Sequence, residues 1–342
     1  MPNVVLLGLA SGLLWWPVAP LVCAQDQSLP VETVADQLRD PTSVVIQPGT
    51  GHPFVADVGL PGVVRWSGEA WEPVIIHAQD GAEGGQAGDA IQCLAWLSPQ
   101  MLAVGTRGSE SERGAVRLFQ VPPVGGEPLM IDQPASELPD WPNEEGVGAE
   151  SIVALIGQEQ TLVVASVTEQ GQAGLTRASP GEDGAWGSSH RLWSGISKSP
   201  AASPSALAFS PEGHVVICHA GDSEDAARCR LTFVALDGTS LESFELSLAG
   251  WVGLAYHRPS GWLLGLMGQD HDQHPAGLYR IVAETPERGR AVLLAKVDQP
   301  TAMTVAPNGD VWITDAGPVS SEPTQANGRL AVIRAAAFEV LR

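Results

Sequence analysis

The residues best suited to chemistry form one short cluster, Asp270-His271-Asp272-Gln273-His274. Carboxylate and imidazole groups placed this close together can ligate a divalent metal ion. Asp270, His271 and His274 are therefore candidate metal ligands. The cluster follows Gly268 in a polar segment, so a solvated loop is the competing interpretation.

Carboxylates also recur where apolar segments begin or end. Asp57 and Asp315 close two equivalent runs, Val-Ala-Asp-Val-Gly and Ile-Thr-Asp-Ala-Gly, and Asp40 and Glu150 stand at the start of others. Calcium prefers oxygen ligands, so these four residues are candidates for holding Ca²⁺ or another divalent metal. A carboxylate at Asp57 or Asp315 can instead accept backbone N–H groups and fix the following turn.

Two other features of the sequence are a tryptophan that could bind a ligand and a pair of cysteines that could form a disulfide. Trp141 lies in the long polar segment Pro139-Asp-Trp-Pro-Asn-Glu-Glu, where it can stack on a sugar or a partner, or anchor its own loop. Cys218 and Cys229 flank the loop of one predicted hairpin with ten residues between them. A cross-strand disulfide between them is a candidate in an oxidising compartment.

Composition limits the partners. The 342 residues include 18 Lys+Arg and 39 Asp+Glu, a formal net charge of −21. Binding to nucleic acid or to an anionic membrane surface requires a basic face, so the sequence argues against both. The expected partners are an extracellular or envelope protein, a glycan or a small molecule.

The body of the chain repeats. Six apolar segments begin near residues 40, 90, 150, 203, 251 and 299, and each is followed by a short turn and a second apolar segment. A looser loop leads to a third strand, and a fourth apolar run, such as Leu129-Met-Ile, often closes the unit. Four short strands in a period of roughly 50 residues are typical of a β-propeller blade.

The repeats predict an all-β fold, a single six-bladed propeller of four-stranded antiparallel blades over residues 25–342. The N-terminal strand around Val31–Asp36 is expected to supply the outer strand of the last blade, and the segment Phe338–Arg342 competes for that place. Protected blade edges favour a monomer. Arg65, Arg117, Arg177 and Arg280 recur on the third strands, where intra-blade ion pairs or packing over the blade surface are expected.

Residues 1–24 are expected to be a signal peptide. An apolar run ends in Val22-Cys23-Ala24, whose small residues favour cleavage after Ala24 and a secreted or periplasmic protein. An uncleaved N-terminal membrane anchor is the alternative, because the uncharged stretch is long enough to span a bilayer.

The frames Asp40-Pro-Thr-Ser-Val, Phe54-Val-Ala-Asp-Val-Gly and Gln299-Pro-Thr-Ala-Met-Thr-Val-Ala-Pro-Asn-Gly resemble NHL repeats and blades of the SMP-30/gluconolactonase-like superfamily. The resemblance implies a six-bladed propeller and, for the lactonase branch, a divalent ion held by a Glu, two Asn and an Asp. Here the first of these positions falls on Asp40. Asn143, Asn308 and Asn327 do not match the Asn positions.

Three functions remain open at this point. The first is a binding module that holds a protein, glycan or surface polymer through long acidic loops on one face. The alternative is a metal-dependent lactone or ester hydrolase. A sugar dehydrogenase that uses the quinone cofactor PQQ is the third, although an acidic face is poorly suited to the carboxylates of that cofactor.

Overall fold

A computed structural model describes residues 28–60, 62–77, 90–108, 113–138, 151–158, 160–168, 172–181, 186–195, 204–219, 228–270, 274–317 and 326–341. This part of the chain contains 25 strands and one short helix. None of its helices is long and apolar enough to cross a membrane. The proposed signal peptide lies outside the described residues.

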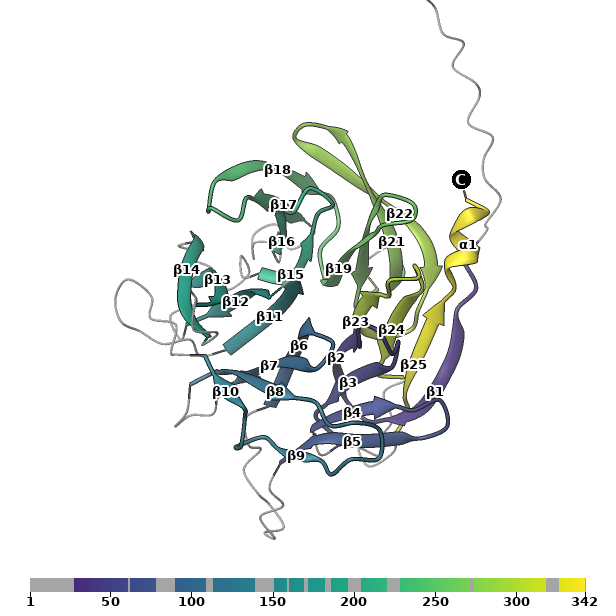
Figure 1. Cartoon of the computed structure of the whole chain (residues 1–342). Helices are drawn as coiled ribbons and strands as arrows, with labels where there is room; N and C mark the ends of the chain where they lie inside the picture. Colours follow the sequence, from purple (N-terminus) through teal and green to yellow (C-terminus); the bar gives the residue numbers. More distant parts are fainter. Residues whose placement is uncertain are drawn as a thin grey trace, which may run out of the picture.

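The strands form successive antiparallel blades around a common centre (Figure 1). Blade one contains β2 (Pro41–Ile46), β3 (Pro53–Asp57), β4 (Gly62–Trp66) and β5 (Trp71–Ile76). Blade two contains β6 (Ala90–Ser98), β7 (Met101–Arg107), β8 (Val116–Gln120) and β10 (Ser136–Glu137). Blade three contains β11 (Ser151–Gln158), β12 (Thr161–Val167), β13 (Ala173–Pro180) and β14 (Trp186–Gly195).

The second half of the chain repeats this pattern. Blade four contains β15 (Pro204–Phe209), β16 (Val215–His219), β17 (Cys229–Val234) and β18 (Ser240–Leu246). Blade five contains β19 (Trp251–His257), β20 (Trp262–Met267), β21 (Gly277–Thr285) and β22 (Arg288–Lys296). Blade six contains β23 (Pro300–Val305), β24 (Val311–Asp315), β25 (Gly328–Ile333) and β1 (Glu32–Leu38). The first strand of every blade begins within one residue of its predicted start.

One predicted strand belongs to a different blade. The run Leu129-Met-Ile was expected to close blade two, but β9 (Leu129–Met130) pairs in parallel with β5 at the edge of blade one. The outer strand of blade two is β10, which pairs with β8. The chain after β8 therefore crosses to the neighbouring blade and returns, which a strand pattern alone does not reveal.

The hydrophobic core lies between the blades. Each of six clusters of buried apolar side chains combines residues from two neighbouring blades, including one cluster between blade six and blade one. The second strands are almost wholly buried, as in Pro53–Asp57 and Val311–Asp315. Strands buried on both faces must be continuously apolar, which explains the runs that the sequence shows.

The N-terminal strand closes the ring, as predicted. β1 pairs antiparallel with β25, from Glu32 opposite Val332 to Leu38 opposite Gly328. The competing C-terminal segment instead forms α1 (Ala335–Glu339), whose Phe338 is buried. The Phe338 ring stacks on the His257 ring of blade five, with centroids 4.3 Å apart. The N-terminal strand therefore completes blade six by strand pairing, and the C-terminal helix packs against blade five by aromatic contact.

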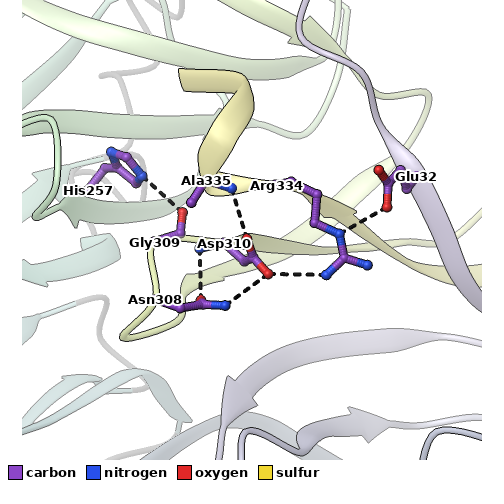
Figure 2. A network of polar contacts seen from close by, with 7 residues as sticks. All are labelled: Glu32, His257, Asn308, Gly309, Asp310, Arg334 and Ala335. Carbon is purple, nitrogen blue, oxygen red and sulfur yellow. Dashed lines mark hydrogen bonds and ion pairs between the residues drawn. The ribbon is translucent and has the colours of Figure 1, made fainter. Parts of the chain in front are cut away.

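A polar network reinforces this closure at the end of the propeller where the first strand of each blade turns into the second, called here the turn end (Figure 2). Arg334 donates to Glu32 at 3.0 Å and to Asp310 at 3.1 Å. Asp310 also accepts the N–H of Ala335 at 2.8 Å. The network joins the strand that precedes blade one to the last turn of blade six.

The repeated arginines do more than pair within their own blades. Arg65 forms the expected ion pair with Glu72 of its blade at 2.8 Å, and it also donates to the carbonyls of Pro122 and Pro123 in the segment that follows β8. Arg177 of blade three similarly donates to the carbonyl of Leu236 in blade four. These two arginines therefore connect neighbouring blades.

Candidate functional site

The six first strands share one irregularity. Each carries an extra residue near its start that has no partner on the second strand, a β-bulge. The six bulge residues, called here the bulge ring, are Thr42, Gln92, Val153, Ser205, Val252 and Thr301. They lie at the entry end, opposite the turn end, on the strands that Figure 1 places nearest the centre. Bulges are over-represented next to active sites.

The bulge ring is uncharged and rich in hydrogen-bonding groups. Thr42 Oγ1 donates to the carbonyl of Ile91 at 2.9 Å, and Ser205 Oγ donates to the carbonyl of Cys218 at 3.3 Å. The Thr301 and Thr314 hydroxyls are 2.9 Å apart. A hydroxyl that donates one hydrogen bond still has lone pairs that can accept from a ligand. The Thr42, Ser205 and Thr301 side chains are half-buried, so they are held in place and partly open to solvent.

A second set of equivalent positions lies beside the bulges. In each blade, one residue at the end of the second strand pairs with the residue that immediately precedes the bulge. These residues are Asp57, Thr106, Ser166, His219, Met267 and Asp315. The charged and titratable members lie in blades one, four and six. The His219 ring lies against the Trp193 ring of blade three at 5.1 Å.

Asp57 has the structural role that was the alternative to metal binding. Its carboxylate accepts four backbone N–H groups, from Arg39 at 2.8 Å, Gly59 at 2.9 Å, Asp40 at 3.0 Å and Leu60 at 3.1 Å. The side chain is buried. The carboxylate thus fixes both the chain that enters blade one and the turn that follows β3, and little of its capacity remains for a cation.

Asp315 is engaged in a similar way. Its carboxylate accepts the N–H of Gly317 at 2.7 Å and the Nε and Nη2 atoms of Arg329 at 3.1 and 2.7 Å. Arg329 Nη2 also contacts Asp298 at 3.0 Å. The hydrogen bond with Asp315 raises the pKa of Arg329 above its usual range. A buried carboxylate that is neutralised by its own arginine does not fit a calcium site.

The remaining metal candidates are only partly within the described structure. Asp40 is exposed. Asp270 accepts the N–H of Ala276 at 2.6 Å, and His274 is exposed. Glu150, His271 and Trp141 lie outside the described residues. Among the residues that are described, no group of three or more His, Cys, Asp or Glu side chains could hold a metal ion. Metal binding by these loops stays a prediction.

The sequence contains a signal for part of the bulge ring. In three blades the proline at the start of the first strand is followed by a hydroxyl residue, in Pro41-Thr42, Pro204-Ser205 and Pro300-Thr301. His219 and Trp193 carried no such signal, because they lie in different blades and meet only in the folded protein.

The comparisons with known proteins agree with the fold. No family model and no curated protein sequence matches the chain. Among solved structures, a gluconolactonase from Xanthomonas campestris is 13% identical, with a TM-score of 0.58 over 90% of this chain and 91% of that one.

Two sugar dehydrogenases are also similar in structure. A PQQ-bound aldose sugar dehydrogenase from Streptomyces coelicolor is 13% identical, with a TM-score of 0.55 over 90% of this chain and 98% of that one. A soluble aldose sugar dehydrogenase from Escherichia coli is 10% identical, with a TM-score of 0.55 over 89% of this chain and 99% of that one. At these identities the likeness establishes a shared fold, a β-propeller. Chemistry must be argued from the site.

Proposed function

We propose that the protein binds a small sugar-derived molecule at the entry end and hydrolyses a lactone or related ester of that class. The observation that carries the proposal is the bulge ring, whose neutral hydroxyl and amide groups suit a polyhydroxylated ligand. The fold is shared with proteins described as a gluconolactonase and as sugar dehydrogenases, which supports a sugar derivative over other small molecules.

The proposed chemistry uses the titratable residues beside the bulge ring. Hydrolysis of a lactone requires a base that takes a proton from water as it attacks the carbonyl carbon. Histidine has the ordinary pKa best suited to this task near neutral pH, and His219 lies at the end of β16 next to the Ser205 bulge. We assign His219 as the base. Arg107, the exposed last residue of β7 in blade two, supplies a positive charge at the entry end for the carboxylate of the product.

A metal-dependent route would require ligands other than the two best candidates. Asp57 and Asp315 are already held by backbone N–H groups and by Arg329. The described residues therefore do not fit the divalent ion that the lactonase resemblance implies, and no step of the proposed reaction is routed through it.

The first test measures hydrolysis of δ-gluconolactone by titration of the acid released, against the spontaneous rate. The wild-type chain is expected to exceed the spontaneous rate, and His219→Gln to lower kcat by about 100-fold. His214→Gln is the matched control, because His214 lies at the turn end of the same blade. A wild-type rate equal to the spontaneous rate would contradict the hydrolase.

An EDTA arm separates the two routes to hydrolysis. Activity that survives EDTA agrees with His219 as the base. Activity that EDTA abolishes and Ca²⁺ restores would transfer the chemistry to the predicted ligands Asp40, Glu150, Asp270, His271 and His274, and a loss in Glu150→Gln would then locate the ion.

A binding module without turnover is the second candidate. It is favoured by the commitment of Asp57 and Asp315 to the fold, which leaves the entry end with hydrogen-bonding groups but without two of the expected metal ligands. Calorimetry with the same lactone and its open acid distinguishes the two functions, because binding of either without hydrolysis supports the module. A PQQ dehydrogenase is less well supported, since Arg329 is already paired with Asp315 and Asp298.

A further inference from the structure

Two cysteines of blade four lie in position to bond. Cys218 lies near the end of β16, opposite Leu231 of the neighbouring strand β17. Cys229 lies two residues before Leu231 on β17. Residues two apart on a strand share a face of the sheet. The two cysteines are therefore diagonal partners on one face, and their sulfur atoms are 2.9 Å apart.

The surroundings favour a bond over two separate thiols. A disulfide requires a sulfur–sulfur distance of about 2.05 Å, so the sulfurs need to approach by less than about 1 Å. Both side chains are buried, and they belong to the apolar cluster between blades four and five, together with Trp251 and Met267. A disulfide contains no hydrogen-bond donor that this apolar surrounding would leave without an acceptor.

Cys93 provides a contrast within the same chain. It is also buried, but it lies in blade two, and its thiol donates to the carbonyl of Ile152 at 3.6 Å. It belongs to the cluster between blades two and three, away from the other two cysteines. Burial alone therefore does not bring a cysteine to another sulfur in this fold.

We propose that Cys218 and Cys229 form a disulfide that is made during folding. The thiolate of one cysteine attacks the disulfide of a small oxidant such as oxidised glutathione, which releases one glutathione thiol and leaves a mixed disulfide. The second cysteine attacks the protein sulfur of the mixed disulfide and releases the other glutathione thiol. Two protons and two electrons leave the protein, and the oxidant is released as two thiols. The contact with Cys218 and burial raise the pKa of Cys229 in the folded chain, so exchange is fastest before the blades pack.

The bond lies at the entry end, where β16 ends and β17 begins. It fastens β16 to β17 directly beside His219 and close to Ser205, whose hydroxyl donates to the carbonyl of Cys218. The proposal does not depend on the proposed hydrolase, because it rests on the strand register and on the two sulfur positions.

The direct test is a peptide map of the full chain folded with mixed reduced and oxidised glutathione. Free thiols are blocked with N-ethylmaleimide in denaturant, and the protein is digested with trypsin without reduction. Cleavage after Lys198, Arg228 and Arg230 gives peptide 199–228 joined to the dipeptide 229–230, with a mass two hydrogens below the sum. Recovery of both peptides carrying N-ethylmaleimide, or of either cysteine joined elsewhere, would overturn the proposal.

Stability gives an independent readout. Reduction of the wild-type chain is expected to lower Tm by about 5 °C, since the bond constrains the segment between the two cysteines in the unfolded chain. The double variant Cys218→Ser/Cys229→Ser should not respond to the reductant, and Cys93→Ser should respond as the wild type does. A wild-type Tm that is unchanged by reduction contradicts the proposal. If the double variant does not fold, the peptide map of the wild type still decides it.

Discussion

The two ends of the propeller use the same ion-pair chemistry for different purposes. At the turn end, Arg334 joins Glu32 and Asp310 across segments that are distant in sequence (Figure 2). Arg334 and Glu32 are exposed, and Asp310 is buried. At the entry end, Arg329 and Asp315 lie on neighbouring strands of one blade, and Asp315 is fully buried. One pair closes the ring, and the other holds a single turn.

This difference explains what each end is free to do. Charged groups at the turn end connect the two ends of the chain, and the buried Phe338 covers His257 there. At the entry end, the Asp57 carboxylate binds nearby backbone N–H groups and the Asp315 carboxylate binds Arg329. Among the described residues, the groups that the proposed function assigns to a ligand are the neutral bulge residues, His219 and Arg107. Conspicuous charge is therefore a poor guide to function in this fold.

The largest effect is expected for Asp57→Ala at the entry end. The substitution removes the acceptor of four N–H groups in a buried position, and the free energy of unfolding should fall by about 4 kcal/mol. Urea denaturation measures it. Asp237→Ala is the control, because Asp237 accepts an N–H in an exposed turn of blade four and should change stability little. Equal effects of the two variants would show that the buried acceptor is dispensable.

A smaller effect is expected when the arginines of the two ends are exchanged for alanine. Arg329→Ala leaves the buried Asp315 without its cation and should cost about 3 kcal/mol of stability. Arg334→Ala breaks an exposed pair with Glu32 and a pair with Asp310, which keeps the Asn308 amide and the N–H of Ala335 as donors, and should cost about 1 kcal/mol. Raised salt should reduce the second effect more than the first. A reversed order would mean that ring closure, and not the buried turn, depends more strongly on its ion pair.

The smallest effect concerns pH. The two tyrosines of the sequence lie in blade five, Tyr256 toward the turn end and Tyr279 toward the entry end. Burial raises the pKa of each to about 12, with a further contribution from Glu212 and Glu242 at Tyr256 and from Asp270 at Tyr279. Because the unfolded pKa is about 10, the stabilising contribution is present below pH 10 and is lost as pH rises toward 12.

Absorbance of tyrosinate at high pH tests this expectation at both ends. The folded protein should show no ionised tyrosine until the pH approaches 12, and Tyr256→Phe and Tyr279→Phe assign the two signals. A tyrosine that ionises near pH 10 in the folded chain would identify the end at which the blade is open to water.

Much of the architecture could be predicted because it depends on local pattern. Apolar runs such as Phe54–Asp57 and Val311–Asp315 must be strands buried on both faces, and their spacing set the blades within one residue. The place of Leu129-Met-Ile was predicted wrongly, because the choice between two neighbouring blade edges depends on how the connecting chain crosses. The site was harder to predict. The sequence indicates that Asp57 and Asp315 could bind a metal ion, but it does not show which donors surround their carboxylates in the folded chain.

The sequence by itself determined the repeat, the strands and the excess of acidic charge, and it favoured the N-terminal strand over the C-terminal segment as the means of closure. Only the tertiary structure decided that Asp57 binds backbone N–H groups and that Asp315 binds Arg329. It also decided that Thr42, Ser205 and Thr301 occupy equivalent bulges, and that the Cys218 and Cys229 sulfur atoms lie close together. Hydrophobic periodicity is a property of a single strand, and a sequence displays it directly. The partner of a polar group is set by register and by contacts between blades, which arise only when the ring has closed.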